Sequence, residues 1–114
     1  MKIAIPTNDR ITIAKRTGKA TEIAFYVIDN GAIKSVTYTK NTHSHDDHGR
    51  NDVNYNLDER EELNYDKLLD ILIDVDLLLV KAVGKYMKKT LQKANINYQL
   101  VSTDAISEIL KDYL

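Results

Sequence analysis

A run of four apolar residues constrains the fold of this chain more than any other feature. Residues 77–80 read Leu-Leu-Leu-Val and lie between the charged residues Asp76 and Lys81. A continuous apolar run of this length is typical of a strand that is covered on both faces. Apolar residues at helical spacing precede it at 65–73 and follow it at 84–94. The sequence therefore predicts an α/β fold with a central strand at 77–80.

Two β-rich runs, residues 23–29 and 33–39, are joined by the dipeptide Asn30-Gly31. This dipeptide favours a tight hairpin because both of its turn positions adopt positive φ. The sequence therefore predicts that the two runs are antiparallel neighbours. Short runs predict two more strands, at 2–5 and 97–101.

The order of these elements predicts the architecture. The order is strand, hairpin, helix, strand, helix, strand, helix, and the last helix follows capping residues at 102–104. Strand-helix-strand units form right-handed parallel crossovers, so the strands at 2–5 and 77–80 should be parallel neighbours. We expect one α/β domain spanning residues 1–114, with a mixed five-stranded sheet and about three helices packed on both faces. The loops after 2–5 and 77–80 should face a common crevice.

Composition excludes several classes of function. The chain has no cysteine, so it has no disulfide, no thiolate nucleophile and no sulfur ligand of the type that usually holds zinc or an iron-sulfur cluster. Sixteen basic and seventeen acidic residues give a formal net charge of -1, which offers no global attraction for nucleic acid or an anionic membrane. No segment approaches the length of a membrane span, and the first residues lack a secretory pattern. We therefore expect a cytoplasmic protein that recognises its partners locally.

All three histidines, His43, His45 and His48, lie within six residues, with two aspartates between them. Imidazole is the commonest metal ligand, so these residues predict a site for Zn, Ni, Cu or Co. The alternative is a solvated polar loop that binds metal only adventitiously. The surrounding segment, at about 41–63, is polar and then strongly acidic, and we expect it to be a flexible exposed loop.

Two further positions suit an anion. Lys15, Arg16 and Lys19 surround Gly18 in the loop after the first strand, where cations and backbone N-H groups can bind an anion together. Gly84 precedes the second helix, and a helix N-terminus also favours negative charge. The alternatives are an ordinary solvated loop and a plain turn.

The chain resembles the dinitrogenase iron-molybdenum cofactor-binding family of nitrogenase accessory proteins. The resemblance runs nearly end to end, and it rests on the opening strand, the first glycine loop, the central strand with its glycine turn, the following helix and the closing helix: residues 1–8, 18–20, 76–84, 91–96 and 106–114. It implies a ribonuclease-H-like fold and a cytoplasmic carrier of an iron-molybdenum or related iron-sulfur cluster. It also implies metallocluster assembly proteins as partners.

The chain departs from the family pattern in its first loop. Many members carry His-Phe-Gly where this chain has Arg16-Thr17-Gly18. A guanidinium has no lone pair for a metal, but it can pair with an anionic cluster or with an organic carboxylate such as homocitrate. The resemblance thus implies cofactor contacts at Arg16, Gly18, Lys19 and Gly84 without ligation by the first loop. A His-Gly step that is frequent in the family is matched by His48-Gly49.

Enzymatic activity has no support in the sequence. Ribonuclease-H-like nucleases need a carboxylate on the first strand to hold two divalent ions, and residues 2–5 contain none. Phosphate-binding glycine motifs and nucleophile motifs are absent too.

We therefore predict a non-catalytic binding or carrier module for a cluster or metal ion. Two alternatives are a His-loop divalent-metal binder unrelated to nitrogenase and a protein-interaction module that has lost the ligand. The sequence does not specify the oligomeric state.

Overall fold

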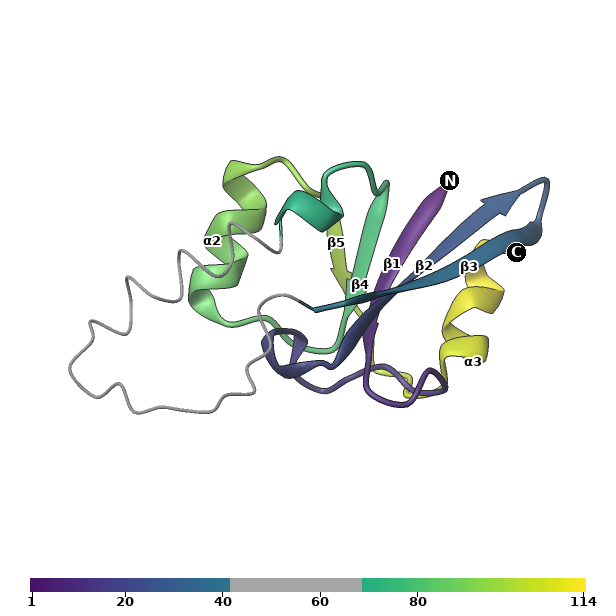
Figure 1. The fold of residues 1–114 in the computed structure, drawn as a ribbon, viewed down its shortest axis with the longest axis horizontal. Helices are drawn as coiled ribbons and strands as arrows, with labels where there is room; N and C mark the ends of the chain where they lie inside the picture. Colours follow the sequence, from purple (N-terminus) through teal and green to yellow (C-terminus); the bar gives the residue numbers. More distant parts are fainter. Residues whose placement is uncertain (42–68) are drawn as a thin grey trace.

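The apolar run at 77–80 forms strand β4 (Leu77–Val80), which pairs in parallel with β1 (Lys2–Thr7) as predicted (Figure 1). The structure, a computed structural model, describes residues 1–41 and 69–114. The other strands are β2 (Glu22–Asp29), β3 (Ala32–Lys40) and β5 (Tyr98–Leu100). They complete a sheet of order β3-β2-β1-β4-β5, in which β2 is antiparallel to β1 and β3 while β5 is parallel to β4. The predicted mixed five-stranded sheet is confirmed.

The predicted hairpin between β2 and β3 is also confirmed. Asn30 has φ 54° and Gly31 has φ 74°, so both turn residues adopt the left-handed conformation that the dipeptide favours. The register of the hairpin shifts between Val27 and Ile28, which marks a bulge in β2. Strand β3 lies at the edge of the sheet, and most of its side chains are exposed.

Helices cover both faces of the sheet, as the sequence predicted. The described helices are α2 (Lys85–Lys93), α3 (Ile106–Leu110), the 3-10 turns η1 (Thr17–Lys19) and η2 (Lys111–Tyr113), and a helical segment at 69–72. The predicted loop at 41–63 lies outside the described residues except for Asn41, and so does the first part of the helix predicted at 65–73. Among the described residues no helix is long and apolar enough to cross a membrane.

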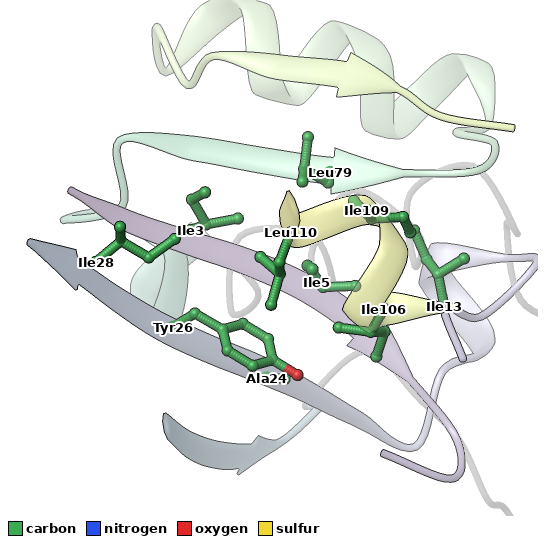
Figure 2. Close-up of a cluster of buried hydrophobic side chains, with 10 residues drawn as sticks. All are labelled: Ile3, Ile5, Ile13, Ala24, Tyr26, Ile28, Leu79, Ile106, Ile109 and Leu110. Atoms are coloured by element: carbon green, nitrogen blue, oxygen red, sulfur yellow. The ribbon is translucent and has the colours of Figure 1, made fainter. Parts of the chain in front are cut away.

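Alternation along β1 divides the core into two apolar clusters. Ile3 and Ile5 point to the face that α3 covers, and Ala4 points to the opposite face. The first cluster joins β1, β2 and β4 to α3 through Tyr26, Ile28, Leu79, Ile106, Ile109 and Leu110 (Figure 2). The second joins the sheet to α2 and the segment 69–72 through Phe25, Leu78, Val80, Leu72, Met87 and Leu91. The three central strands, β1, β2 and β4, thus contribute to both layers, as strands covered on both faces require.

The predicted cap of the last helix is wrong. Residues 102–104 do not cap α3; its N-cap is Ala105, which makes no side-chain cap hydrogen bond. Asp104 instead forms an ion pair with Lys81 at the end of β4, and its backbone carbonyl accepts a hydrogen bond from the N-H of Ile13. Long-range partners thus replace the local hydrogen bond that the sequence pattern predicted.

Candidate functional site

The loop after β1 turns back on the strand and is held by its own polar groups. The N-H of Ala14 donates to the carbonyl of Pro6 at 2.8 Å. The Asp9 carboxylate accepts hydrogen bonds from the backbone N-H groups of Ile11 at 2.9 Å and Thr12 at 2.7 Å. These hydrogen bonds, from Thr12 first, lower the pKa of the Asp9 carboxyl below its ordinary value. The start of the loop is therefore a tight turn built around one carboxylate.

Arg10 is held by partners on the hairpin. Its guanidinium forms two hydrogen bonds with the Glu22 carboxylate, at 2.9 and 2.8 Å, and lies 4.1 Å from the centre of the Tyr38 ring. The hydrogen bond from Arg10 is the main cause of the lowered pKa of Glu22. This bidentate pair fixes the loop to β2.

A buried asparagine holds the next turn of the loop. The side-chain amide of Asn41 donates to the carbonyls of Thr17 at 3.0 Å and Ala20 at 2.9 Å, on either side of Gly18. Asn41 is fully buried, and its backbone N-H donates to the carbonyl of Thr21. The sequence predicted an exposed loop from about residue 41, and for Asn41 that prediction is wrong. No local pattern points to this role, because its partners lie 21 and 24 residues earlier in the chain.

The loops after β1 and β4 meet at one hydrogen bond. The hydroxyl of Thr17, which is buried, donates to the carbonyl of Ala82 at 3.0 Å. Gly84 follows two residues later as the N-cap of α2, with φ -74° and an exposed position. The two loops are thus in contact, because the parallel strands β1 and β4 end on the same side of the sheet.

An open pocket of about 540 Å³ lies beside this contact. Arg16 and Lys19 line it, together with Lys15; the remaining lining residues are Asn8, Asp9, Thr12, Ile13, Ala14 and Asp104. Gly18 forms the middle of η1, and neither Gly18 nor Gly84 is among the lining residues. The structure therefore brings two of the four predicted cofactor contacts, Arg16 and Lys19, into one pocket and places Gly18 and Gly84 in the adjoining turns.

The pocket has more available positive than negative charge. Its three cations, Lys15, Arg16 and Lys19, are exposed, and none forms an ion pair within the part of the chain that the structure describes. Both carboxylates are engaged elsewhere, Asp9 with its own turn and Asp104 with Lys81. The pKa of Asp104 is lowered, first by the hydrogen bond from Lys81 and then by the charges of Lys81 and Lys15. An anion can therefore enter without displacing an existing pair.

The described residues that line this pocket do not include three metal-ligating side chains. Its lining contains no imidazole, and the chain contains no thiolate. Over residues 1–41 and 69–114 no three His, Asp or Glu side chains come together as a metal-binding group. His43, His45 and His48 lie outside the described residues. The lining side chains can hold a ligand by charge and hydrogen bonds.

Residues 1–114 match the model of the family described as dinitrogenase iron-molybdenum cofactor. The chain belongs to this family. The resemblance predicted from the sequence is thereby confirmed, and it relates the chain to proteins of the nitrogenase iron-molybdenum cofactor. No curated protein matches the chain in sequence.

Two solved structures share the fold at low sequence identity. One is a candidate dinitrogenase from Methanocaldococcus jannaschii, with 15% identity and a TM-score of 0.67, covering 99% of this chain and 86% of the other. The second is a candidate NifB protein of the DUF35 family from Thermotoga, with 19% identity and a TM-score of 0.63, covering 98% and 85%. At these identities the likeness shows a shared fold, which is the α/β fold predicted from the sequence.

Proposed function

We propose that this protein is a non-catalytic carrier of an anionic metal cluster, which it binds in the pocket beside the Gly18 loop. The observation that carries the proposal is the set of three cations, Lys15, Arg16 and Lys19, that line one pocket without a carboxylate partner in the described chain. The family to which the chain belongs is named for an iron-molybdenum cofactor. The cluster is here a cargo that the protein receives and passes on.

The chemistry of the pocket suits a cargo that must be released. Arg16 offers a planar guanidinium that can bind a carboxylate through two hydrogen bonds, whereas Lys15 and Lys19 act as mobile point charges. Charge-assisted hydrogen bonds of this kind are stronger than neutral ones but form no covalent bond to the metal. Gly18 and Gly84 support the site, since they lie in the two turns joined by the Thr17 hydrogen bond. Metallocluster assembly proteins would then be the partners that load and unload the protein.

Anaerobic reconstitution tests the proposal. The parent protein is mixed with isolated iron-molybdenum cofactor and desalted, and the iron and molybdenum that stay with the chain are measured. We expect Arg16→Ala combined with Lys19→Ala to retain several-fold less of both metals than the parent. The matched control is Lys34→Ala with Lys40→Ala, which removes two exposed lysines of β3 and leaves the pocket intact. Equal retention by the pocket variant and the parent would refute the proposal.

A divalent-metal site at His43, His45 and His48 is the second candidate function. It rests on the sequence alone, because three imidazoles within six residues can surround one ion. Calorimetry with Ni, Zn and Cu ions compares the parent with the triple variant His43→Ala, His45→Ala and His48→Ala. We expect binding by the parent to weaken below about pH 6.5, where the imidazoles gain protons and stop ligating. Identical binding by the parent and the triple variant would exclude the histidines.

The third reading, a protein-interaction module that has lost its ligand, predicts that neither experiment detects binding. A parent protein that retains no molybdenum and binds no divalent ion would favour this reading over both proposals.

A further inference from the structure

The charged side chains of helix α2 are all positive, and they lie on one exposed side of the helix. Its nine residues include four lysines and no acidic residue, and all four lysines are exposed: Lys85, Lys88, Lys89 and Lys93. At 3.6 residues per turn these positions fall within an arc of about 140°. Met87 and Leu91 lie on the other side of the helix and are buried against the sheet. We call the four lysines the lysine face.

The lysine face is not neutralised by the described part of the molecule. None of the four lysines forms an ion pair there; Lys85 lies over the ring of Tyr86, at 5.5 Å. Lysines three or four positions apart on a helix repel each other. The first turn of α2 carries no acidic residue, so Lys85 also opposes the positive end of the helix dipole. Packing alone does not account for a helix surface that lowers its own stability.

An exposed apolar residue lies at the end of the sheet where α2 begins. Leu100 is the last residue of β5 and pairs with Val80, so its side chain points to the same face of the sheet as α2. It is 58% exposed, and β5 forms the outer edge of the sheet. Because β4 and β5 are parallel, their carboxyl ends lie side by side. Leu100 therefore lies at the same end of the sheet as the turn that leads into Lys85.

We propose that the lysine face, together with Leu100, docks an acidic protein that presents carboxylates around an apolar side chain. Charge complementarity selects the partner, since four cations that form no ion pair within residues 1–41 and 69–114 attract and orient an acidic surface. A nucleic acid fits less well, because the formal net charge is -1 and the one aromatic ring of α2, Tyr86, is half-buried. A membrane fits less well because the apolar side of α2 is already buried in the core.

The docking surface lies next to the pocket. Lys85 follows Ala82 by three residues, and the Ala82 carbonyl accepts the hydrogen bond from Thr17 in the loop that carries Arg16 and Lys19. A protein docked on α2 would therefore stand beside whatever the pocket holds. The docking proposal does not depend on the proposed cargo, because the charges and the exposure of the surface are independent of the pocket.

Fluorescence anisotropy on the full chain tests the proposal. The probes are a labelled amphipathic peptide of glutamate and leucine, polyglutamate of equal length, a 20-base-pair DNA duplex and vesicles of phosphatidylcholine with phosphatidylserine. We expect Lys85→Glu with Lys89→Glu to weaken binding of the amphipathic peptide about tenfold or more. The control Lys34→Glu with Lys40→Glu, which reverses two exposed lysines of β3, should change it less than about twofold.

The melting temperature distinguishes a variant that has lost docking from one that has lost its fold. The changes at Lys85 and Lys89 place carboxylates in the first turn and within three or four positions of Lys88 and Lys93. The melting temperature of this variant should therefore rise by about 2 to 5 °C while binding weakens.

Leu100→Ser should weaken binding of the amphipathic peptide and leave polyglutamate binding unchanged. Equal peptide binding by the α2 variant and the parent would overturn the proposal, and so would tighter binding of DNA or vesicles than of the peptide. An unchanged affinity of the Leu100 variant for the amphipathic peptide would remove Leu100 from the surface.

Discussion

Single buried polar side chains hold the candidate site in shape. Asn41 and Thr17 are buried, and both direct side-chain donors at backbone carbonyls of the loops after β1 and β4. A buried carbonyl that loses its donor costs much more than an exposed one, because water does not replace the hydrogen bond. The positions of the exposed pocket cations therefore depend on residues that do not line the pocket.

Replacing Asn41 with Ala should destabilise the protein clearly. The change removes the side-chain donor to the carbonyls of Thr17 and Ala20, although the Thr17 carbonyl still accepts a hydrogen bond from the backbone N-H of Ala20 at 3.3 Å. We expect a loss of about 2 to 3 kcal/mol in the free energy of unfolding. Urea denaturation measures it. The matched control is Asn8→Ala, because Asn8 is exposed and its side-chain oxygen accepts hydrogen bonds from Thr21, so its loss should cost under about 1 kcal/mol. Equal costs would show that Asn41 does not hold the loop.

Asp9 should make the folded state sensitive to acid. Its pKa is lowered from the ordinary value of 3.8 by the N-H groups of Thr12 and Ile11. A carboxyl with a lowered folded-state pKa stabilises the fold above its unfolded value, and that stability is lost as the pH falls through the folded value. The stability of the parent should therefore fall more steeply below pH 3.8 than that of Asp9→Asn. Thermal melts from pH 6 to pH 2 measure both slopes, and parallel curves would contradict the assignment.

At the residue scale the sequence predicted the pocket cations but not the long-range contacts that hold their loop in place. Arg16 and Lys19 are close in the chain, so their shared position in one pocket follows from a short loop. The hydrogen bonds of Asn41 and the pairing of Asp104 with Lys81 join residues more than 20 positions apart. Partners of this kind are set by the folded chain, and no local pattern of residue types encodes them.

At the scale of elements, the β2-β3 hairpin shows how a turn residue fixes a strand pair. Gly31 has φ 74°, and a Cβ added there would lie 3.1 Å from the backbone oxygen of Leu114. Gly31→Ala should therefore cost about 1 to 2 kcal/mol through backbone strain and crowding. Gly84→Ala is the control, because Gly84 has φ -74° and tolerates a side chain. Urea denaturation compares the two variants, and a cost at Gly31 no larger than at Gly84 would contradict the argument.

Elements with a clear local pattern were predicted well. The strand at 77–80 and the Asn30-Gly31 hairpin follow from apolar patterning and positive-φ preference, which act over a few residues. The helical spacing at 84–94 predicted the second helix, which is α2, and Asn95 adopts φ 59° just beyond it. The extension of β1 through Pro6 to Thr7 was missed, because pairing with β2 prolongs the strand past the apolar run. The 3-10 turn η1 was missed as well, since tertiary hydrogen bonds hold it.

At the scale of the whole molecule, the two apolar clusters fix the end of the sheet at which the polar loops after β1 and β4 lie. The sheet is buried under α3 on one face and under α2 on the other, so the polar loops of the pocket lie where β1 and β4 end. The loops at this edge are joined to each other by Thr17 and to the segment before α3 by Lys81 and Asp104. A ligand that binds the pocket therefore contacts groups whose positions depend on the complete fold.

Binding in the pocket should accordingly raise the melting temperature of the whole domain. Citrate serves as a probe because its three carboxylates match the three cations that line the pocket. A ligand that binds only the folded state at ten times its Kd adds about 1.4 kcal/mol to the free energy of unfolding, a shift of about 3 to 6 °C here. Arg16→Ala with Lys19→Ala should melt within a few degrees of the parent without citrate, because both side chains are exposed and form no ion pair in the described chain. With citrate, that variant should lose most of the shift.

Citrate at high concentration also stabilises folded proteins by exclusion from their surface, so the comparison needs a variant that keeps the pocket. Lys34→Ala with Lys40→Ala removes the same charge from β3 and should retain the full shift. Differential scanning fluorimetry over a range of citrate concentrations measures all three proteins. A saturable shift in the parent and the β3 variant, absent in the pocket variant, would place binding at Arg16 and Lys19. Equal shifts in all three would mean that citrate acts by exclusion and that the cations of the loop do not form an anion site.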